Sequence, residues 1–168
     1  MTVAEDRTRL PSLTAPPPGT LAVGIAAFAV VELSLAVFMA ASPHAFYTAI
    51  GPFGAFNAHY IRDVASFEAA LGLALVIAVR RPSWRVPVLA MTTVQFALHS
   101  LNHLIDIGNA HPRWTGYFDF FSLAAATVVL AWLWRVASLD AADRARAAAV
   151  VELHPPPPLS PTAGRSIT

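Results

Sequence analysis

The chain has 168 residues, of which 56% are hydrophobic and 12% are charged, and its formal net charge is +1. A soluble domain of this length has too small an interior for so much apolar surface, so we expect lipid to cover part of it. Every basic residue is arginine and no basic patch stands out, which argues against a nucleic-acid-binding protein. The absence of cysteine excludes disulfides, thiolate catalysis, iron–sulfur clusters and Cys-ligated zinc.

Residues 1–19 are polar and rich in proline, which predicts a disordered N-terminal tail. The apolar stretch 20–41 is long enough to cross a bilayer as a helix. It ends at Ser42-Pro43, because the residue before a proline avoids helical angles. The aromatic-rich segment 42–57 suits the membrane interface, where a short helix or a re-entrant turn is expected.

Three further apolar stretches of spanning length follow, separated by an Arg-Arg-Pro sequence and by a short loop with glycine and proline. We therefore predict an all-α fold, a polytopic membrane protein built as an antiparallel four-transmembrane-helix bundle over residues 20–137. Residues 138–168 should form a short surface helix and then a Pro-rich disordered tail. The four expected spans are 20–41, 59–79, 84–107 and 115–137.

The arginines predict the orientation of such a bundle. Only Arg62 and Arg113 fall on one side of a four-span topology, and the other nine arginines fall on the opposite side. The positive-inside rule then places both termini in the cytoplasm. Arginine without lysine, together with abundant alanine and proline, indicates a GC-rich bacterial genome, so we expect the bacterial inner membrane.

Polar side chains form a stripe on the third span, within an arc of about 100° at helical spacing. Groups of this kind are costly at membrane depth unless they find partners, so the stripe predicts a site. Within it, two imidazoles stand one helical turn apart, a spacing that lets them share one ion. The stripe consists of Gln95, His99, Asn102, His103 and Asp106.

Depth estimates from the helical rise place acidic or imidazole groups of all four spans in the outer half of the bundle. The deeper set should lie about 12–15 Å below the outer surface, and the shallower set about 5–6 Å below it. The inner half is almost wholly apolar, which predicts a cup that opens outward rather than a through-pore. The deeper set is Glu32, Glu68 and His99, and the shallower set is Asp63, His103 and Asp119.

The leading hypothesis is a divalent metal site, because helical bundles commonly build such sites from Glu and His on facing helices. Its ligands would be Glu32, Glu68, His99 and His103, and this donor set favours iron, manganese or zinc. Such a site could activate water or oxygen toward a lipid or a quinone. The supporting groups around the ligands would be His59, Arg62, Asp63, Gln95, Asn102, Asp106 and Asp119. Among these, Arg62 and Asp63 are expected to form a structural ion pair.

Three alternatives stay open. The same residues could bind a proton or a small solute in a carrier subunit, for which four helices are few, so a homodimer would be expected. Haem is a less favoured alternative, with His99 and a histidine of another span or of a second copy as axial ligands. The polar groups could also serve only helix packing in an accessory structural protein.

The segment from Asn57 to Asp106 resembles small, uncharacterised bacterial inner-membrane proteins of three to four helices. Those proteins share N-x-H-x-x-R-D at the start of one helix and H-x-x-x-H near the end of the next. The resemblance implies a helical membrane architecture and no particular activity. DoxX-like membrane proteins are similar in size and span count only. The matching residues are Asn57, His59, Arg62, Asp63, His99 and His103.

Overall fold

The computed structural model describes residues 19–153, which form five helices and no strand. The prediction of an all-α fold is therefore confirmed for this part of the chain. The expected disordered tails, up to residue 18 and from residue 154, lie outside the described residues. The helices are α1 (Thr20–Ala41), α2 (Pro43–Ala49), α3 (Ala58–Arg80), α4 (Pro82–Ile105) and α5 (Arg113–Leu153).

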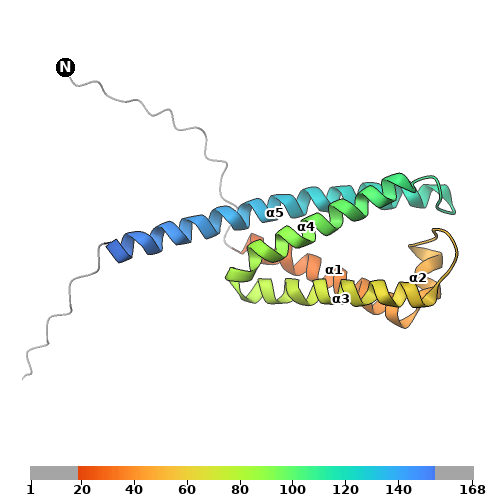
Figure 1. Ribbon diagram of the computed structural model, residues 1–168, viewed down its shortest axis with the longest axis horizontal. Helices are drawn as coiled ribbons and strands as arrows, with labels where there is room; N and C mark the ends of the chain where they lie inside the picture. The colour runs from red at the N-terminus through yellow and green to blue at the C-terminus, as the bar shows by residue number, and fades with distance from the viewer. Residues whose placement is uncertain (1–18, 154–168) are drawn as a thin grey trace, which may run out of the picture.

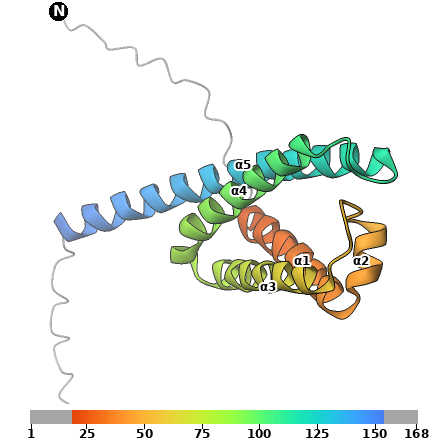
Figure 2. The same cartoon turned by 45° about the vertical axis from the view of Figure 1, so that its right-hand side comes forward.

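The four long helices associate as two pairs. Helix α1 packs along α3, and α4 packs along α5, while the contacts between the pairs are far fewer (Figure 1). The pairs meet near the tight turn that joins α3 to α4. Figure 2 shows that they diverge away from this turn, toward α2 and the α4–α5 loop. We call the first region the turn end of the bundle and the second the loop end.

The turn end holds the apolar core, to which α1, α3, α4 and α5 all contribute. Arg85 closes this end, because its Nε donates to the carbonyl of Ala78 at 3.2 Å and its Nη2 donates to that of Val79 at 3.3 Å. These carbonyls belong to the last turn of α3, where carbonyl groups have no backbone N–H partner within the helix. The buried core residues are Leu21, Ile25, Ala29, Leu75, Ala78, Val88, Leu89, Phe96, Leu130, Leu133 and Ala137.

Helices α1 and α3 approach each other closely at Gly72. A Cβ atom at this position would lie 2.7 Å from Leu33 Cγ and 3.2 Å from Glu32 Cβ. Only glycine therefore allows the two backbones to come this near. This contact fixes the level at which the Glu32 side chain meets α3.

One predicted boundary is wrong. The sequence suggested a separate surface helix after residue 137, but α5 continues without a break from Arg113 to Leu153. No glycine or proline follows Gly116 until Pro155, and alanine, the strongest helix former, dominates this segment. Ion pairs of Asp140 with Arg144 and of Asp143 with Arg146 support the extension.

By length and apolar composition, two helices within residues 19–153 are able to cross a membrane, namely α1 and α5. Helices α3 and α4 are as long as α1 but carry more polar residues, including Arg62, Asp63 and Glu68 on α3. The predicted four-span bundle is therefore not established by composition alone.

Candidate functional site

The divergence of the helix pairs leaves a cavity of about 1110 Å³ at the loop end. Apolar side chains of α1, α3, α4 and α5 line most of it, and polar side chains also contribute to its wall. Those that we call the polar wall come from three helices, and they are Glu68 of α3, Gln95, His99, Asn102 and His103 of α4, and Asp119 and Ser122 of α5. Tyr47, Asn57 and Tyr60 also line the cavity.

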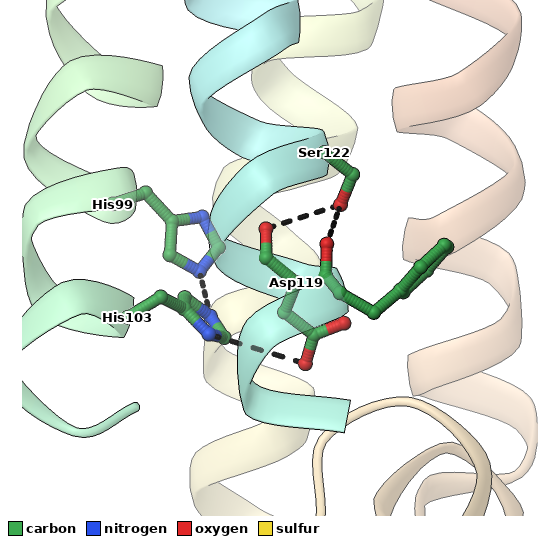
Figure 3. A network of polar contacts seen from close by, with 5 residues as sticks. His99, His103, Asp119 and Ser122 are labelled. Atoms are coloured by element: carbon green, nitrogen blue, oxygen red, sulfur yellow. Dashed lines mark hydrogen bonds and ion pairs between the residues drawn. The ribbon is translucent and has the colours of Figure 1, made fainter. Parts of the chain in front are cut away.

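Two imidazoles meet on α4. His99 and His103 lie one helical turn apart, so their side chains project from the same face. Their Nε2 atoms are 3.2 Å apart, within hydrogen-bond distance (Figure 3). A neutral imidazole has one donor and one acceptor nitrogen. If His99 Nε2 donates, His103 carries its own hydrogen on Nδ1.

That Nδ1 faces a carboxylate of the opposite helix. Asp119 Oδ2 lies 3.9 Å from His103 Nδ1, and both side chains are largely buried (Figure 3). This distance is longer than a hydrogen bond, and neither atom has another partner in the described structure. The buried Oε1 of Gln95 also has none. Three buried polar atoms without a partner therefore belong to residues that line one cavity.

Two glutamates lie on the helices next to this cavity. Glu32 is only 1% exposed, and its buried Oε1 has no hydrogen-bond partner in the described structure. It meets α3 beside Gly72, where a Cβ would lie 3.2 Å from Glu32 Cβ. Glu68 and His99 line the cavity, whereas Glu32 is not among its lining residues. The three residues expected at a common depth are therefore divided between the cavity wall and the α1–α3 contact.

The segment that joins α2 to α3 crosses the loop end and forms the outer wall of the cavity. Phe53 pairs with Ala110 in an isolated antiparallel bridge, and His111 N donates to the carbonyl of Pro52 at 3.3 Å. The Phe53 ring packs edge-on against His103, with ring centroids 4.9 Å apart. The expected outward-opening cup is therefore covered at this point by residues of its own first loop.

One residue of the predicted stripe lies away from the cavity, and one expected ion pair is wrong. Asp106 is not among the residues that line the cavity, and it accepts a hydrogen bond of 2.8 Å from the Asn109 side chain. It follows the last residue of α4, where the chain already turns away from the bundle. Asp63 was expected to pair with Arg62, but it contacts His59 at 3.4 Å on an exposed surface. Successive helical residues point in directions about 100° apart, whereas i and i+4 face each other.

The N-x-H-x-x-R-D pattern at the start of α3 has a structural component that the pattern alone did not predict. Asn57 is the N-cap of α3, and its Oδ1 accepts a hydrogen bond of 3.1 Å from the backbone N–H of Tyr60. An asparagine directly before an apolar helix is a known start signal and would have indicated this role. Ser122 was also missed, because a serine on a membrane helix gives no distinctive signal.

Within residues 19–153, no group of three or more His, Asp and Glu side chains is arranged to hold a single metal ion. The imidazole pair of His99 and His103 is the part of the predicted ligand set that lies together. No family model, curated protein or solved structure matches this chain. The function therefore has to be inferred from the site itself.

Proposed function

We propose that the chain is a multi-pass membrane protein in which α1, α3, α4 and α5 all cross the bilayer. The first three have 22, 23 and 24 residues. Such helices are about 33–36 Å long, close to the roughly 30 Å of a hydrocarbon core. Large apolar side chains are exposed on every one of them, and water would disfavour so extensive a surface. Examples are Val30, Phe67, Met91 and Phe121.

The arginines support an orientation for this arrangement. Among the described residues, only Arg62 and Arg113 lie near the loop end. The positive-inside rule places the turn end in the cytoplasm and the loop end, with its cavity, in the outer half of the membrane. The arginines of the turn end and of the α5 extension are Arg80, Arg81, Arg85, Arg135, Arg144 and Arg146.

Within that frame, we infer that the cavity binds a small molecule and that its polar wall forms hydrogen bonds with it. The observation that carries this inference is the set of buried atoms without a partner, Gln95 Oε1, His103 Nδ1 and Asp119 Oδ2. Buried polar atoms in folded proteins nearly always have a hydrogen-bond partner. Three such atoms around one cavity indicate a guest that has polar groups of its own.

The geometry suits such hydrogen bonds. A neutral imidazole has one donor and one acceptor nitrogen, so the pair of His99 and His103 can serve a guest that donates or a guest that accepts. Asp119, which lies 3.9 Å from His103 Nδ1, favours the tautomer with a hydrogen on that nitrogen. The wall therefore carries both donors and acceptors for a polar group of the guest.

Chemical extraction of purified protein tests this function. Protein isolated in a mild detergent should retain a small molecule near one equivalent, detected by mass spectrometry of the extract. His103→Ala or Asp119→Asn should lower the retained amount about tenfold or more, since a hydrogen bond to a charged group contributes about 1.5–3 kcal/mol. His59→Ala is the matched control, because this imidazole is exposed and lies outside the cavity. Equal retention by all four proteins, or none by any, would refute the function.

A metal ion on His99 and His103 is a second candidate, favoured by one distance. Two nitrogens bound to one tetrahedral zinc ion at about 2.0–2.1 Å lie about 3.3–3.4 Å apart. The observed Nε2 separation is 3.2 Å. A carboxylate that faces the other nitrogen of a ligating histidine, as Asp119 faces His103, is a common companion of such sites. Iron and manganese accept the same donors. Of the two glutamates in the predicted ligand set, Glu68 is the one that lines the cavity together with His99 and His103.

Metal analysis separates this candidate from the first. Wild-type protein should bind Zn²⁺, Fe²⁺ or Mn²⁺ near one equivalent, and the double variant His99→Ala/His103→Ala should bind almost none. The His59→Ala variant should bind as wild type does. Near-zero metal in every protein would remove the metal site and leave the small-molecule site standing. A haem would need a histidine from another span or from a second copy, because axial ligands approach the iron from opposite faces and His99 and His103 share one helix face.

A further inference from the structure

The cavity reaches the side of the bundle between α3 and α4. The residues that line it there are large, apolar and exposed, namely Phe67 at 74%, Met91 at 67%, Val94 at 55% and Leu98 at 59%. Helices α3 and α4 separate with distance from their shared turn (Figure 2). In the proposed orientation this side faces the lipid chains. We call these four residues the lateral opening.

The route from the outer aqueous side is different. Phe53, bridged to Ala110, lies across the loop end and packs against His103. The Tyr47 hydroxyl donates to the carbonyl of Gly54 at 2.6 Å and ties the same segment to α2. A molecule that approaches His103 from water therefore meets the bridged Phe53 segment, whereas a molecule within the bilayer meets the apolar side chains of the lateral opening.

The charges of the cavity wall restrict the polar part of a guest. Two acidic residues, Glu68 and Asp119, line the cavity, and no arginine is among its lining residues in the described part of the chain. The whole sequence has no lysine. An anionic headgroup would lack a permanent cation and would face two carboxyls. A neutral carbonyl or hydroxyl headgroup could instead bond with the imidazoles and with the Gln95 amide.

We propose that the guest is a neutral amphipathic lipid with a carbonyl or hydroxyl headgroup, which enters sideways from the bilayer through the lateral opening. Its headgroup binds at His99, His103 and Gln95, and its tail lies against the apolar wall. This proposal rests on the proposed function, because it names the chemical class of the guest. A membrane quinone and a long-chain alcohol share this chemistry.

Photolabelling of the full chain in lipid nanodiscs tests the proposal. Three probes carry the same diazirine-bearing alkyl tail and differ in headgroup: a primary alcohol, a benzoquinone and a carboxylate. At least one neutral probe should label residues of the cavity wall, and excess unlabelled alcohol or quinone should compete with it. The neutral probe that labels the cavity more strongly shows whether the guest is an alcohol or a quinone. The carboxylate probe should label the cavity at least about tenfold less, because the carboxyls oppose it.

Substitutions at the lateral opening test the route. Val94→Trp should lower cavity labelling about tenfold, since an indole narrows the opening. Leu101→Trp is the matched control, because Leu101 lies on the same helix, is 50% exposed and does not line the cavity. If Val94→Trp fails to fold, competition by unlabelled alcohol or quinone in the wild-type protein still tests whether the cavity binds the probe.

The outcomes separate this proposal from the proposed function. Equal labelling by all three probes, or no labelling of the cavity, would overturn the neutral lipid. If the wild-type protein then still retains a molecule that His103→Ala loses, the small-molecule site stands with a different guest. Labelling that Val94→Trp leaves unchanged would overturn the lateral route. If the wild-type protein shows neither labelling of the cavity nor a retained molecule, both the neutral lipid and the small-molecule site are refuted.

Discussion

The turn end and the loop end of this bundle are built from the same four helices but are packed in different ways. At the turn end, side chains such as Leu75, Leu89 and Leu130 are completely buried. At the loop end, the same helices diverge around a cavity that carries His99, His103 and Asp119. The comparison indicates that one end provides the stability and that the other end is free to carry polar groups with incomplete hydrogen bonding. Four substitutions test this difference between the two ends.

The largest effect is expected at the core of the turn end. Leu89→Ala should lower the free energy of unfolding by about 2–5 kcal/mol, because it removes a completely buried side chain and leaves a cavity. Leu98→Ala, on the same helix at the lateral opening, should change it by less than about 0.5 kcal/mol. Unfolding in detergent micelles, followed by circular dichroism, measures both. Equal losses would contradict the division of the bundle into two ends.

The close contact between α1 and α3 should give the next largest effect. Gly72→Val should destabilise the bundle by about 1–3 kcal/mol, because its side chain would overlap Leu33 and force the helices apart. Gly108→Ala is the control, since nothing lies within 4 Å of a Cβ at that position. The same unfolding measurement applies. A neutral Gly72→Val would mean that α1 and α3 are less tightly joined than described.

The start of α3 should contribute about 1 kcal/mol. Asn57→Ala removes the N-cap acceptor of the Tyr60 N–H and should lower the unfolding free energy by about 0.5–2 kcal/mol. Asn57→Ser restores an acceptor and should recover most of the loss. If the serine variant is as unstable as the alanine variant, Asn57 acts through another contact.

The smallest effect is expected at the cavity and should have the opposite sign. Gln95→Leu removes a buried amide oxygen that has no partner, so stability should stay level or rise by up to about 1 kcal/mol. Retention of the co-purified molecule should fall in the same variant. Thr92→Val serves for comparison, because the Thr92 hydroxyl already donates to the Val88 carbonyl at 2.8 Å. A clear loss of stability in Gln95→Leu would mean that its amide serves packing.

Periodicity predicted the local part of this structure well. The first helix has the predicted bounds, Thr20–Ala41, and α3 and α4 differ from the prediction by one or two residues at their ends. Helix α4 starts two residues earlier than expected because Pro82 occupies its first turn, where it leaves no hydrogen bond unmade. The imidazole pair also follows from spacing alone. The extension of α5 was missed because charge was taken as a boundary where helix propensity continues.

The contacts between helices were beyond such patterns. That His103 faces Asp119 depends on how α4 and α5 are rotated against each other. The burial of Glu32 against α3 depends on the close approach at Gly72. Neither rotation nor approach distance is encoded in a single helix, because each results from packing against a neighbour.

Composition and the helical period are enough to predict that this protein is helical, that its apolar stretches reach a length able to cross a membrane, and that polar residues gather toward one end of its helices. These properties act locally along the chain. The divergence of the helices into two pairs, the contact of Phe53 with His103 and the set of residues around the cavity were not predictable in this way. They depend on side-chain contacts between segments distant in sequence, and no local pattern specifies them.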